Sequence, residues 1–357
     1  MKIIHTSDIH IDSPLTSRLT LDKVRERRTE LRTSFKRLVD EAVSIGAEAF
    51  IISGDLFDSE RISKRALLSV LDTIASEKSI TFYYLEGNHE KNALRISGIA
   101  LPDNLKFFGE SWTYFAADGV TISGRTAFSS TMFNDLELSE EGKNIVVLHG
   151  ELRDHTDDAG AIGIIDTKGK HIDYLALGHY HSYSANELVD GGIAVYSGTP
   201  EGRGFDEIGE KGYVVIDTDS EKLTHKFVPF AKRRLHIIPL DLSCATRTTD
   251  LGDMAYDVLE DVPRDDLVRL ELVGTYSPEL LKDVDGLSHS FKDRFYYFEV
   301  KDSSRPYINP DDYKYDKSLK GEFIRTVLSD DTLDDEMKGK IISCGINALM
   351  GEEIFGE

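Results

Sequence analysis

The first ninety residues alternate short apolar stretches with longer amphipathic ones, and this alternation restricts the chain to few folds. The short stretches at 1–6, 49–53 and 81–85 are rich in Ile, Phe, Tyr and Leu and have the length of buried strands. Between them, 21–45 and 63–78 repeat apolar residues at the three- and four-residue spacing of a helix face. This βαβαβ order predicts parallel strands, whose following loops meet at one edge of the sheet.

The rest of the chain changes character twice. From about residue 104 to 228 the pattern is rich in strands, which predicts two sheets packed together with helices outside. Beyond 232–234, strands at 235–242, 267–273 and 294–300 and helices at 251–259 and about 278–284 predict a smaller α+β unit. A segment at 302–315 has the composition of a linker, and two apolar helical segments follow it. We predict three parts: 1–231, 232–302 and 303–357.

Five short motifs contain the candidate functional residues, and each motif follows a predicted strand. They are DIH at 8–10, GD at 54–55, GNHE at 87–90, HG at 149–150 and GHYH at 178–181. Strand ends in layered α/β folds are where ligand-binding residues converge. Carboxylate, amide and imidazole groups without a thiolate suit divalent ions such as manganese, iron or zinc. The flanking glycines let the backbone turn sharply beside such an ion.

Each motif alone has a plainer structural explanation. Asp-x-His is often a capped turn and Gly-Asp is a weaker signal still, whereas GNH and GHxH after apolar strands are more specific. All five in this order make coincidence a poor explanation. We therefore predict a two-metal phosphoesterase site built from Asp8, His10, Asp55, Asn88, His89, His149, His179 and His181.

The ordered motifs resemble the calcineurin-like metallophosphoesterase superfamily over about residues 1–228. The quoted stretches are HTSDIHIDSP, ISGDLFD, YYLEGNHE, DYLALGHYH and YSGTPEGRGFDEIGEKGYVVID. The last of these makes the chain most similar to SbcD-type nucleases, the bacterial and archaeal relatives of the eukaryotic meiotic-recombination DNA-repair nuclease. The resemblance implies an α/β fold: a four-layer α-β-β-α sandwich with a smaller α+β capping domain and a C-terminal helical tail. It also implies a 3′–5′ DNA exonuclease and endonuclease acting in double-strand-break repair.

The resemblance also implies a role for each site residue. Two divalent ions, Mn²⁺ or else Fe²⁺ or Zn²⁺, would clamp a phosphodiester and activate a water. One ion would be held by Asp8, His10 and His181 and the other by Asn88, His149 and His179, with Asp55 bridging both. His89 matches a family histidine that is not a ligand. It would stabilise the charge of the phosphoryl group or protonate the departing 3′ oxygen.

Two positions depart from the family pattern. The family usually reads GNHD, whereas Glu90 follows His89 here, and a Glu could orient His89 through its longer side chain. GNHE also occurs in protein Ser/Thr phosphatases of the superfamily, so this motif does not decide the branch. Asp58 stands where some members carry a histidine near the substrate, and a loop carboxylate behind the ligands is the plainer explanation.

Composition limits the partners and the compartment. The formal charge of −22 argues against binding nucleic acid by net electrostatics, but divalent ions can neutralise phosphate locally. The basic trio at 232–234 is the local candidate for a phosphate contact, with a solvated hinge as the alternative. No apolar run approaches the roughly 18 residues of a membrane span, and the N-terminal residues lack a signal-peptide pattern. Cys244 and Cys344 fit buried thiols better than a disulfide, so we expect a cytoplasmic protein without membrane association.

The resemblance further implies partners besides DNA. In the family, a C-terminal helical segment binds the coiled coil of an SMC-like ATPase, and helices of the catalytic domain form a homodimer. Apolar residues at helical spacing in 319–328 and 337–350 fit docking into a groove, and they equally fit packing on the chain's own domain.

Two other functions stay open. One is a phosphatase or small-molecule phosphodiesterase, for which GNHE is the favourable feature. The other is a non-catalytic DNA-binding scaffold subunit, favoured by Glu90 and the acidic charge and opposed by the complete ligand set.

Overall fold

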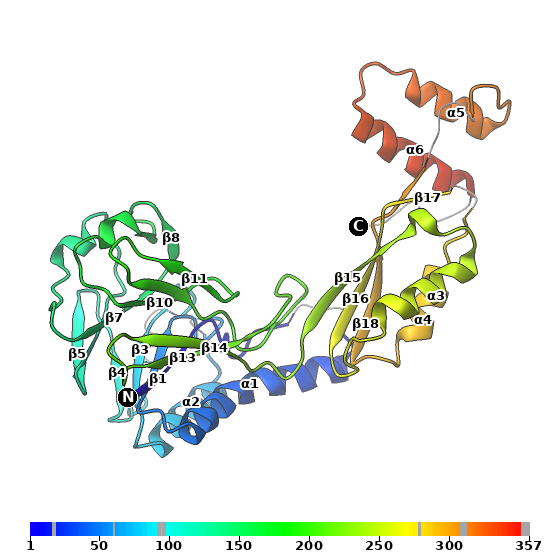
Figure 1. Ribbon diagram of the computed structural model, residues 1–357. Helices are drawn as coiled ribbons and strands as arrows, with labels where there is room; N and C mark the ends of the chain where they lie inside the picture. The colour runs from blue at the N-terminus through cyan, green and yellow to red at the C-terminus, as the bar shows by residue number, and fades with distance from the viewer. Residues whose placement is uncertain are drawn as a thin grey trace. The chain divides into compact units, whose positions relative to one another are not determined.

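The computed structural model describes residues 1–15, 19–59, 61–90, 94, 98–277, 280–307 and 313–350. The chain divides into two compact units, Met1–Arg234 and Leu235–Glu357 (Figure 1). All five motifs lie in the first unit. The capping and partner-binding roles predicted for 232–302 and 303–357 stay predictions.

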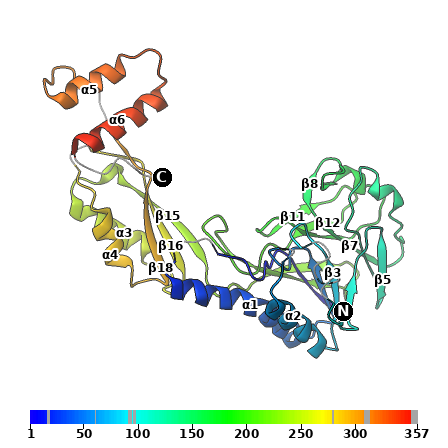
Figure 2. The same ribbon diagram turned by 180° about the vertical axis from the view of Figure 1, so that it is seen from behind.

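The first sheet of unit 1 has the βαβαβ order that the sequence predicts. Its strands lie in the order β14-β13-β1-β2-β3-β4, with β1 to β4 parallel and β13 antiparallel to β1. Helices α1 (Leu21–Ser44) and α2 (Lys64–Ser76) connect the first three strands and lie side by side (Figure 2). The strands are β1 Lys2–Thr6, β2 Ala49–Ser53, β3 Thr81–Leu85, β4 Leu105–Phe107, β13 Gly212–Asp217 and β14 Thr224–Pro229.

Helix α1 buries the face that its apolar spacing predicts. Leu31, Phe35, Leu38 and Val39 are each at most 1% exposed, and Phe35 meets the ring of Phe50 in β2. Burying side chains of this size stabilises the fold by about 1.5–3 kcal/mol each. This layer holds the parallel strands together and so brings their C-terminal ends to one edge.

The second sheet packs against the first through a shared apolar core. Its order is β11-β12-β10-β7-β6-β5. Ile3 and Ile51 of the first sheet belong to one buried cluster with Val147 and Ala176 of the second. The strands are β5 Thr113–Ala117, β6 Val120–Gly124, β7 Lys143–His149, β10 Tyr174–Gly178, β11 Ser184–Glu187 and β12 Ile193–Tyr196. The predicted α/β class with two packed sheets is confirmed.

The outer face of the second sheet differs in detail from the expected helical layer. Residues 98–234, all of which the structure describes, form no α-helix, and the cover of this face includes the 3₁₀ turns η2 (Met132–Asp135) and η3 (Ile165–Thr167) and the short strands β8 (Glu151–Arg153) and β9 (Ala161–Gly163). Met132 and Phe133 of η2 pack on buried residues of β7 and β10. The segment around η2 is rich in Ser, Thr, Asn and Asp, which favour turns over helix interiors.

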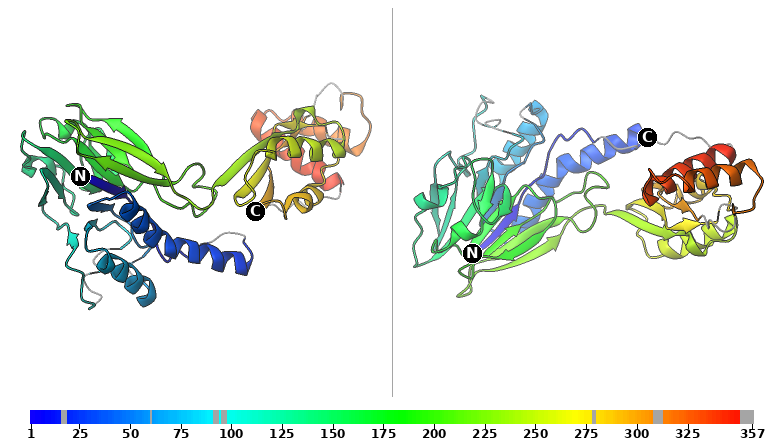
Figure 3. Two further views of the ribbon diagram at one scale, coloured as in Figure 1. Left: turned by 60° about the horizontal axis from the view of Figure 1, so that its bottom comes forward. Right: turned by 90° about the horizontal axis from the view of Figure 1, so that it is seen from above.

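Unit 2 begins with a parallel three-stranded sheet in the order β15-β16-β18 (Figure 3). Helices α3 and α4 pack on it, and α4 begins at the residue where the sequence pattern predicts the end of a helix at about 278–284. Asp283 accepts a hydrogen bond from Gly286 N at 2.8 Å and so caps the helix there, while 278 and 279 lie outside the described residues. The elements are β15 Leu235–Asp241, η4 Leu242–Cys244, α3 Thr248–Leu259, β16 Leu267–Val273, β17 Thr275–Tyr276, α4 Val284–Phe291, β18 Tyr297–Asp302 and β19 Arg305–Pro306.

Two helices follow, α5 (Leu319–Leu328) and α6 (Asp335–Met350), as the sequence predicts. Their apolar side chains pack on each other through Ile324, Val327, Ile342 and Ile346, each at most 8% exposed. Of the two explanations for this apolar character, packing within the chain therefore accounts for these four residues.

Surface features correct one expectation about cysteine. Cys244 and Cys344 are both free and exposed, so the prediction of buried thiols is wrong.

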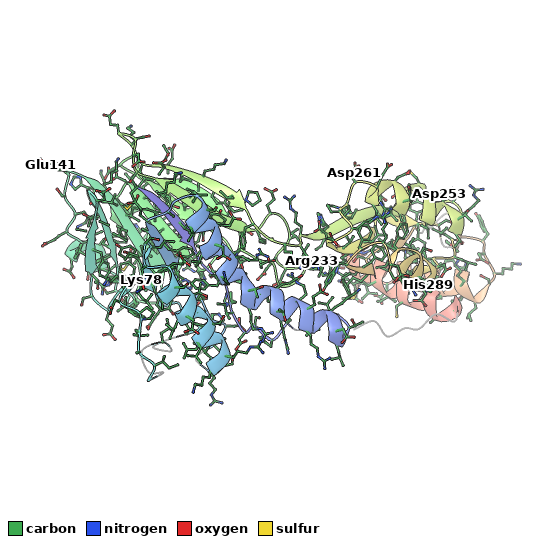
Figure 4. The ribbon with its side chains drawn as sticks, turned by 90° about the horizontal axis from the view of Figure 1, so that it is seen from below. Lys78, Glu141, Arg233, Asp253, Asp261 and His289 are labelled. Atoms are coloured by element: carbon green, nitrogen blue, oxygen red, sulfur yellow. The ribbon has the colours of Figure 1, made fainter. Side chains whose placement is uncertain are left out.

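Lys78 and Glu141 in unit 1, and Asp253 in unit 2, are among the exposed charged side chains labelled in Figure 4. Among the described residues, no helix is both long and apolar enough to span a bilayer.

Candidate metal centre

The predicted site residues lie at or just beyond the C-terminal ends of five strands in the two sheets of unit 1. Asp8 N and His10 N donate to Gly54 O and Asp55 O at 3.0 Å each, which joins the loops after β1 and β2. In the second sheet β7 and β10 pair in parallel, with His149 opposite Gly178. The remaining residues follow β3, which contributes Asn88 and His89, and β10, which contributes His179 and His181.

Four of these residues hold backbone conformations that L residues rarely adopt. The φ angles are +50° at Asp8, +49° at His10, +51° at Asp55 and +110° at His179. Such conformations cost on the order of 1–3 kcal/mol each and persist where surrounding contacts hold them. In the described part of the chain, four of the eight non-glycine residues with positive φ are thus predicted ligands, which is consistent with the predicted site at this edge of the sheets.

Three glycines leave room for the side chains of the site. A Cβ on Gly87 would lie 2.0 Å from Asp55 Oδ1. A Cβ on Gly54 or Gly178 would lie 2.2 Å or 2.7 Å from His149 Nδ1. Only glycine permits this approach, so steric contact explains why glycine stands at these positions of the GD, GNHE and GHYH motifs.

Asp55 stands at the centre of the site and is 2% exposed. Its Oδ2 lies 3.4 Å from His149 Nε2, 3.9 Å from His10 Nε2 and 3.9 Å from His89 Nε2. Its Oδ1 accepts a hydrogen bond from His89 N at 3.2 Å. One carboxylate therefore faces histidines from three different loops, as a bridging ligand would.

Two groups of side chains lie on either side of Asp55. In one, His10 Nε2 lies 3.3 Å from His181 Nε2, which lies 3.8 Å from Asp8 Oδ1. In the other, His149 Nε2 lies 2.9 Å from Asn88 Oδ1. The ring of His179 stands beside that of His149, with centroids 5.6 Å apart, and its backbone N–H donates to the Asp8 carboxylate at 3.1 Å. All eight predicted residues are thus gathered in one place.

Three of the histidines have an acceptor near the outer nitrogen Nδ1, with Nε2 turned toward the site. His149 Nδ1 donates to Ser53 O at 2.9 Å, and His181 Nδ1 donates to Glu207 Oε1 at 2.7 Å. His10 Nδ1 lies 3.1 Å from Asp58 Oδ1. Acceptors behind the ring fix the tautomer and orientation of metal-binding histidines.

The buried charges of the site perturb one another. Burial disfavours the Asp55 carboxylate, but the hydrogen bond and charge of His149 outweigh it and lower the pKa of Asp55 to about 2. Burial likewise disfavours a charged His149, but Asp55 and Asp8 outweigh it and raise the pKa of His149 to about 9. Buried negative charge of this kind attracts a cation, and a divalent ion would take the place of the histidine proton.

Glu90 does not orient His89, the role that the sequence suggests for it. It is fully buried and accepts hydrogen bonds from the backbone N–H of Leu56 at 2.9 Å, of Phe57, and of Gly87 at 3.4 Å. Burial, reinforced by Asp55, raises the pKa of Glu90 to about 8 although the backbone donors oppose the shift. Glu90 therefore holds the loop that carries Asp55.

His89 has a different support. Its Nδ1 donates to the backbone oxygen of Asp58 at 3.3 Å, and its side chain is 45% exposed. The ring of His89 stands edge-on to that of His10, with centroids 5.1 Å apart. Its Nε2 is therefore the nitrogen that faces the site, at a position that solvent and substrate can reach.

A cavity of about 580 Å³ adjoins the second group of side chains. Asn88, His149 and His179 line one part of it, and Arg125 and Phe128 line another. This space is large enough for a nucleotide-sized group beside the site.

Sequence reasoning missed two residues that the structure brings to the site. Arg203 and Glu207 lie in the segment after GHYH that carries the family resemblance, but no short motif marks either residue. Glu207 is 3% exposed and pairs with His181 and Arg203. The only signal was the charged pattern within a glycine-containing stretch.

The basic trio at 232–234 is engaged in ion pairs within unit 1. Arg233, labelled in Figure 4, is 6% exposed and lies 3.1 Å from Glu30 of α1. Lys232 also pairs with Glu30, at 2.8 Å, and Arg234 pairs with Glu210 at 2.7 Å. The predicted phosphate contact is therefore a poorer explanation of this trio than a structural role.

The donor set fits divalent cations. Nε2 atoms, carboxylate oxygens and an amide oxygen are borderline and hard ligands, and among the described residues no thiolate lies in the three candidate groups of the site. Those groups are Asp8–His10–His181, His10–Asp58–His89 and Asp8–Asp55–His149. The chemistry of the site is therefore that of a metal centre.

Comparison with known proteins gives one family and several relatives. The calcineurin-like phosphoesterase family matches residues 1–183. The uncharacterized metallophosphoesterase YhaO of Bacillus subtilis is 24% identical over 316 residues, which are 82% of this chain and 76% of that protein.

Two further relatives are named for DNA repair or nuclease activity. The DNA double-strand break repair protein Mre11 of Sulfurisphaera tokodaii is 26% identical over 260 residues, 67% of this chain and 65% of that protein. The SbcD component of the nuclease SbcCD of Staphylococcus epidermidis is 25% identical over 283 residues, 68% of this chain and 73% of that protein. Both alignments are longer than the stretch that the family matches.

Proposed function

The chain belongs to the calcineurin-like phosphoesterase family, and from this premise we propose that it is a two-metal DNA nuclease. It is a metal-dependent hydrolase of phosphoester bonds, and we propose DNA phosphodiesters as its substrate, cleaved as a 3′–5′ exonuclease and endonuclease. The observation that carries the proposal is the convergence of imidazole, carboxylate and amide groups on Asp55. The two nuclease and repair relatives support DNA as the substrate.

We assign the side chains to two ions. Asp8, His10 and His181 would hold one ion and Asn88, His149 and His179 the other, with Asp55 shared. Mn²⁺ is the proposed metal, and Fe²⁺ or Zn²⁺ would suit the same donors. When bound, the two metal ions would act as Lewis acids that polarise the phosphodiester and the attacking water.

The geometry of His89 supports a role in proton transfer. Its Nδ1–H is used by the Asp58 carbonyl, so Nε2 is the nitrogen that can exchange a proton with substrate. We propose that it stabilises the phosphoryl charge and protonates the departing 3′ oxygen. A positioned acid of this kind contributes roughly 10²–10⁴-fold to a rate.

We further propose that the chain works with an SMC-like ATPase partner and as a homodimer. One relative is itself named as one component of a nuclease. On α6, Met337 and Leu349 are each 46% exposed, and such apolar side chains on the outside of a helix pair can dock a partner segment. Under this proposal 303–357 binds the partner and 232–302 caps the DNA.

One comparison of substrates tests the function. End-labelled duplex DNA, a nitrophenyl phosphodiester and a phosphopeptide are each incubated with Mn²⁺ and the wild type or His89→Ala. We expect DNA and the nitrophenyl ester to be cleaved by the wild type, and DNA cleavage to fall most in the variant. Cleavage of the phosphopeptide alone would contradict the proposed nuclease function and indicate a phosphatase. Two bound ions without turnover would indicate a scaffold.

A further inference from the structure

Arg203 bridges two carboxylates behind the candidate metal centre. Its Nη1 donates to Asp58 Oδ1 at 3.0 Å, and its Nη2 donates to Glu207 Oε1 at 2.8 Å. Its Nε reaches the same Glu207 oxygen at 3.1 Å, and its backbone N–H donates to Glu207 Oε2 at 2.6 Å. The Arg203 side chain is only 19% exposed, so solvent weakens these charged hydrogen bonds only in part.

Each of the two carboxylates also faces the outer nitrogen of one histidine. Asp58 Oδ1, the oxygen that meets Arg203, lies 3.1 Å from His10 Nδ1. Glu207 Oε1, which also meets Arg203, accepts from His181 Nδ1 at 2.7 Å. One guanidinium group therefore joins the supports of two histidines whose Nε2 atoms lie 3.3 Å apart.

The backbone that carries Arg203 is anchored to α1. Arg27 is 2% exposed and donates to Gly202 O at 2.7 Å. Glu207 N donates to Gly204 O at 2.9 Å, which closes a turn immediately after Arg203. The guanidinium thus extends from a fixed main chain and has little freedom to follow a displaced carboxylate.

A planar guanidinium suits this position better than an ammonium. Its fixed fork of donors can meet two carboxylates at once, whereas the lysine ammonium is a compact charge on a flexible stem. Without the fork, Asp58 and Glu207 would lose their common partner and the fixed geometry that it imposes. His181 would then lose the hydrogen-bond acceptor behind its ring, and His10 would lose the carboxylate that lies beside its Nδ1.

We propose that Arg203 is a positioning residue for the divalent cation assigned to Asp8, His10 and His181, and that it sets the affinity of that ion alone. The inference rests on the two-ion assignment of the proposed function. The other ion differs because His149 is oriented by the main-chain oxygen of Ser53 in β2, a support that does not include Arg203.

Charge and geometry make opposite predictions for substitutions of Arg203. If Arg203 acted only as a positive charge, Arg203→Met would tighten the binding of both cations and Arg203→Lys would change neither. If the fork orients the two histidines, both variants weaken one ion. Loss of such an outer support typically costs 10–100-fold in metal affinity.

The test is a titration of the metal-free full-length chain with Mn²⁺. Calorimetry measures the heat of binding, and electron paramagnetic resonance measures the free Mn²⁺. We expect two ions in the wild type. In Arg203→Met and Arg203→Lys, one should weaken 10–100-fold while the other stays within about threefold. A His179→Ala background, which keeps the Asp8, His10 and His181 set, should show the same loss for its remaining ion. Arg269→Met, which breaks a similar pair with Glu299 in unit 2, is the control.

Asp58→Asn is a second variant should the Arg203 variants fold poorly, because Asp58 is partly exposed and its loss removes one arm of the bridge. It should weaken the same ion. Equal weakening of both ions, tighter binding in Arg203→Met, or unchanged titrations with weaker DNA binding would each overturn the inference. Fewer than two ions in the wild type would overturn the two-ion assignment itself and the inference with it.

Discussion

Replacement of Glu90 separates two explanations of the GNHE motif. If Glu90 oriented His89, its substitution would change catalysis and leave the fold intact. The structure instead has its carboxylate accepting from backbone N–H groups of the loop after Asp55. Under this arrangement Glu90 stabilises the protein and fixes the loop of the metal centre, so its loss should appear first in stability and in metal affinity.

The expected magnitude follows from the hydrogen bonds. Glu90→Ala leaves the N–H groups of Leu56 and Phe57 without their acceptor, and each buried unsatisfied donor costs about 1–3 kcal/mol. The longer contact from Gly87, at 3.4 Å, adds little. We expect a loss of about 2–6 kcal/mol, a large part of the roughly 5–15 kcal/mol that stabilises a domain. Glu90→Gln keeps one accepting oxygen and should lose about half as much.

The assay is guanidinium unfolding of the metal-free protein, followed by the fluorescence of Trp112. This is the single tryptophan of the chain and lies in unit 1, where its Nε1 donates to Met132 O, so it reports on the unit that contains Glu90. A midpoint that falls without a change in slope would indicate lost stability. Stability of Glu90→Ala within about 0.5 kcal/mol of the wild type, with activity reduced as in His89→Ala, would refute the reasoning and restore an orienting role.

Further predictions concern three other positions. His89→Ala should lower kcat by roughly 10²–10⁴-fold with an unchanged Mn²⁺ titration, and a lost ion would make His89 a ligand instead. Gly87→Ala, whose Cβ would lie 2.0 Å from Asp55 Oδ1, should abolish tight metal binding measured by calorimetry. Gly252→Ala has open space around its Cβ and should bind normally as the control. Burial lowers the pKa of His5 from 6.5 to about 3, so the unfolded chain binds the proton first. The contribution of uncharged His5 to the free energy of unfolding should therefore be fully present above pH 6.5. It should fall by about 1.4 kcal/mol per pH unit toward pH 3, and His5→Gln should reduce this slope in denaturant titrations.

Local patterns were sufficient to predict the elements that carry the site. The apolar spacing of α1 and α2 and the short apolar strands before them are properties of neighbouring residues, and they predict both the elements and the position of the ligands at strand ends. Within each sheet the gathering of these residues followed from parallel strands, because such strands end at the same edge. The meeting of the two edges depends on how the two sheets pack on each other. The assignment of each side chain to one ion is still a prediction.

Contacts between distant segments could not be predicted in this way. Arg203 and Asp58 are 145 positions apart, and nothing in either local pattern indicates that they meet. The same holds for Lys232 and Glu30, whose ion pair uses a charge that the sequence pattern suggests for a phosphate contact. Side-chain partners of this kind depend on how the layers pack, which hydrophobic spacing specifies only coarsely.

The acidic charge of the chain has a consequence for DNA binding. With a formal charge of −22, attraction to a polyanion must come from local sources. Arg27 and Arg233 are buried in ion pairs, whereas Arg25 is 79% exposed in its side chain and lines, with Arg28 and Arg32, a groove of about 420 Å³ beside residues 12–14. One residue separates them from the end of the motif DIH, so the groove adjoins the loop of the metal centre.

Two divalent ions would add a formal charge of +4 to that centre, more than a few exposed arginines supply. DNA affinity should therefore depend on the metal, whereas the salt dependence should also contain the arginines. We expect the anisotropy of labelled duplex DNA with His89→Ala to report weak binding in EDTA and tight binding with Mn²⁺. Arg25→Gln with Arg32→Gln should reduce the slope of log affinity against log salt by up to about 1.8, at roughly 0.9 for each lost phosphate contact. Equal changes of charge at Lys64 and Arg65 on α2 should leave the slope intact, and metal-independent affinity would mean that the DNA is bound away from the ions.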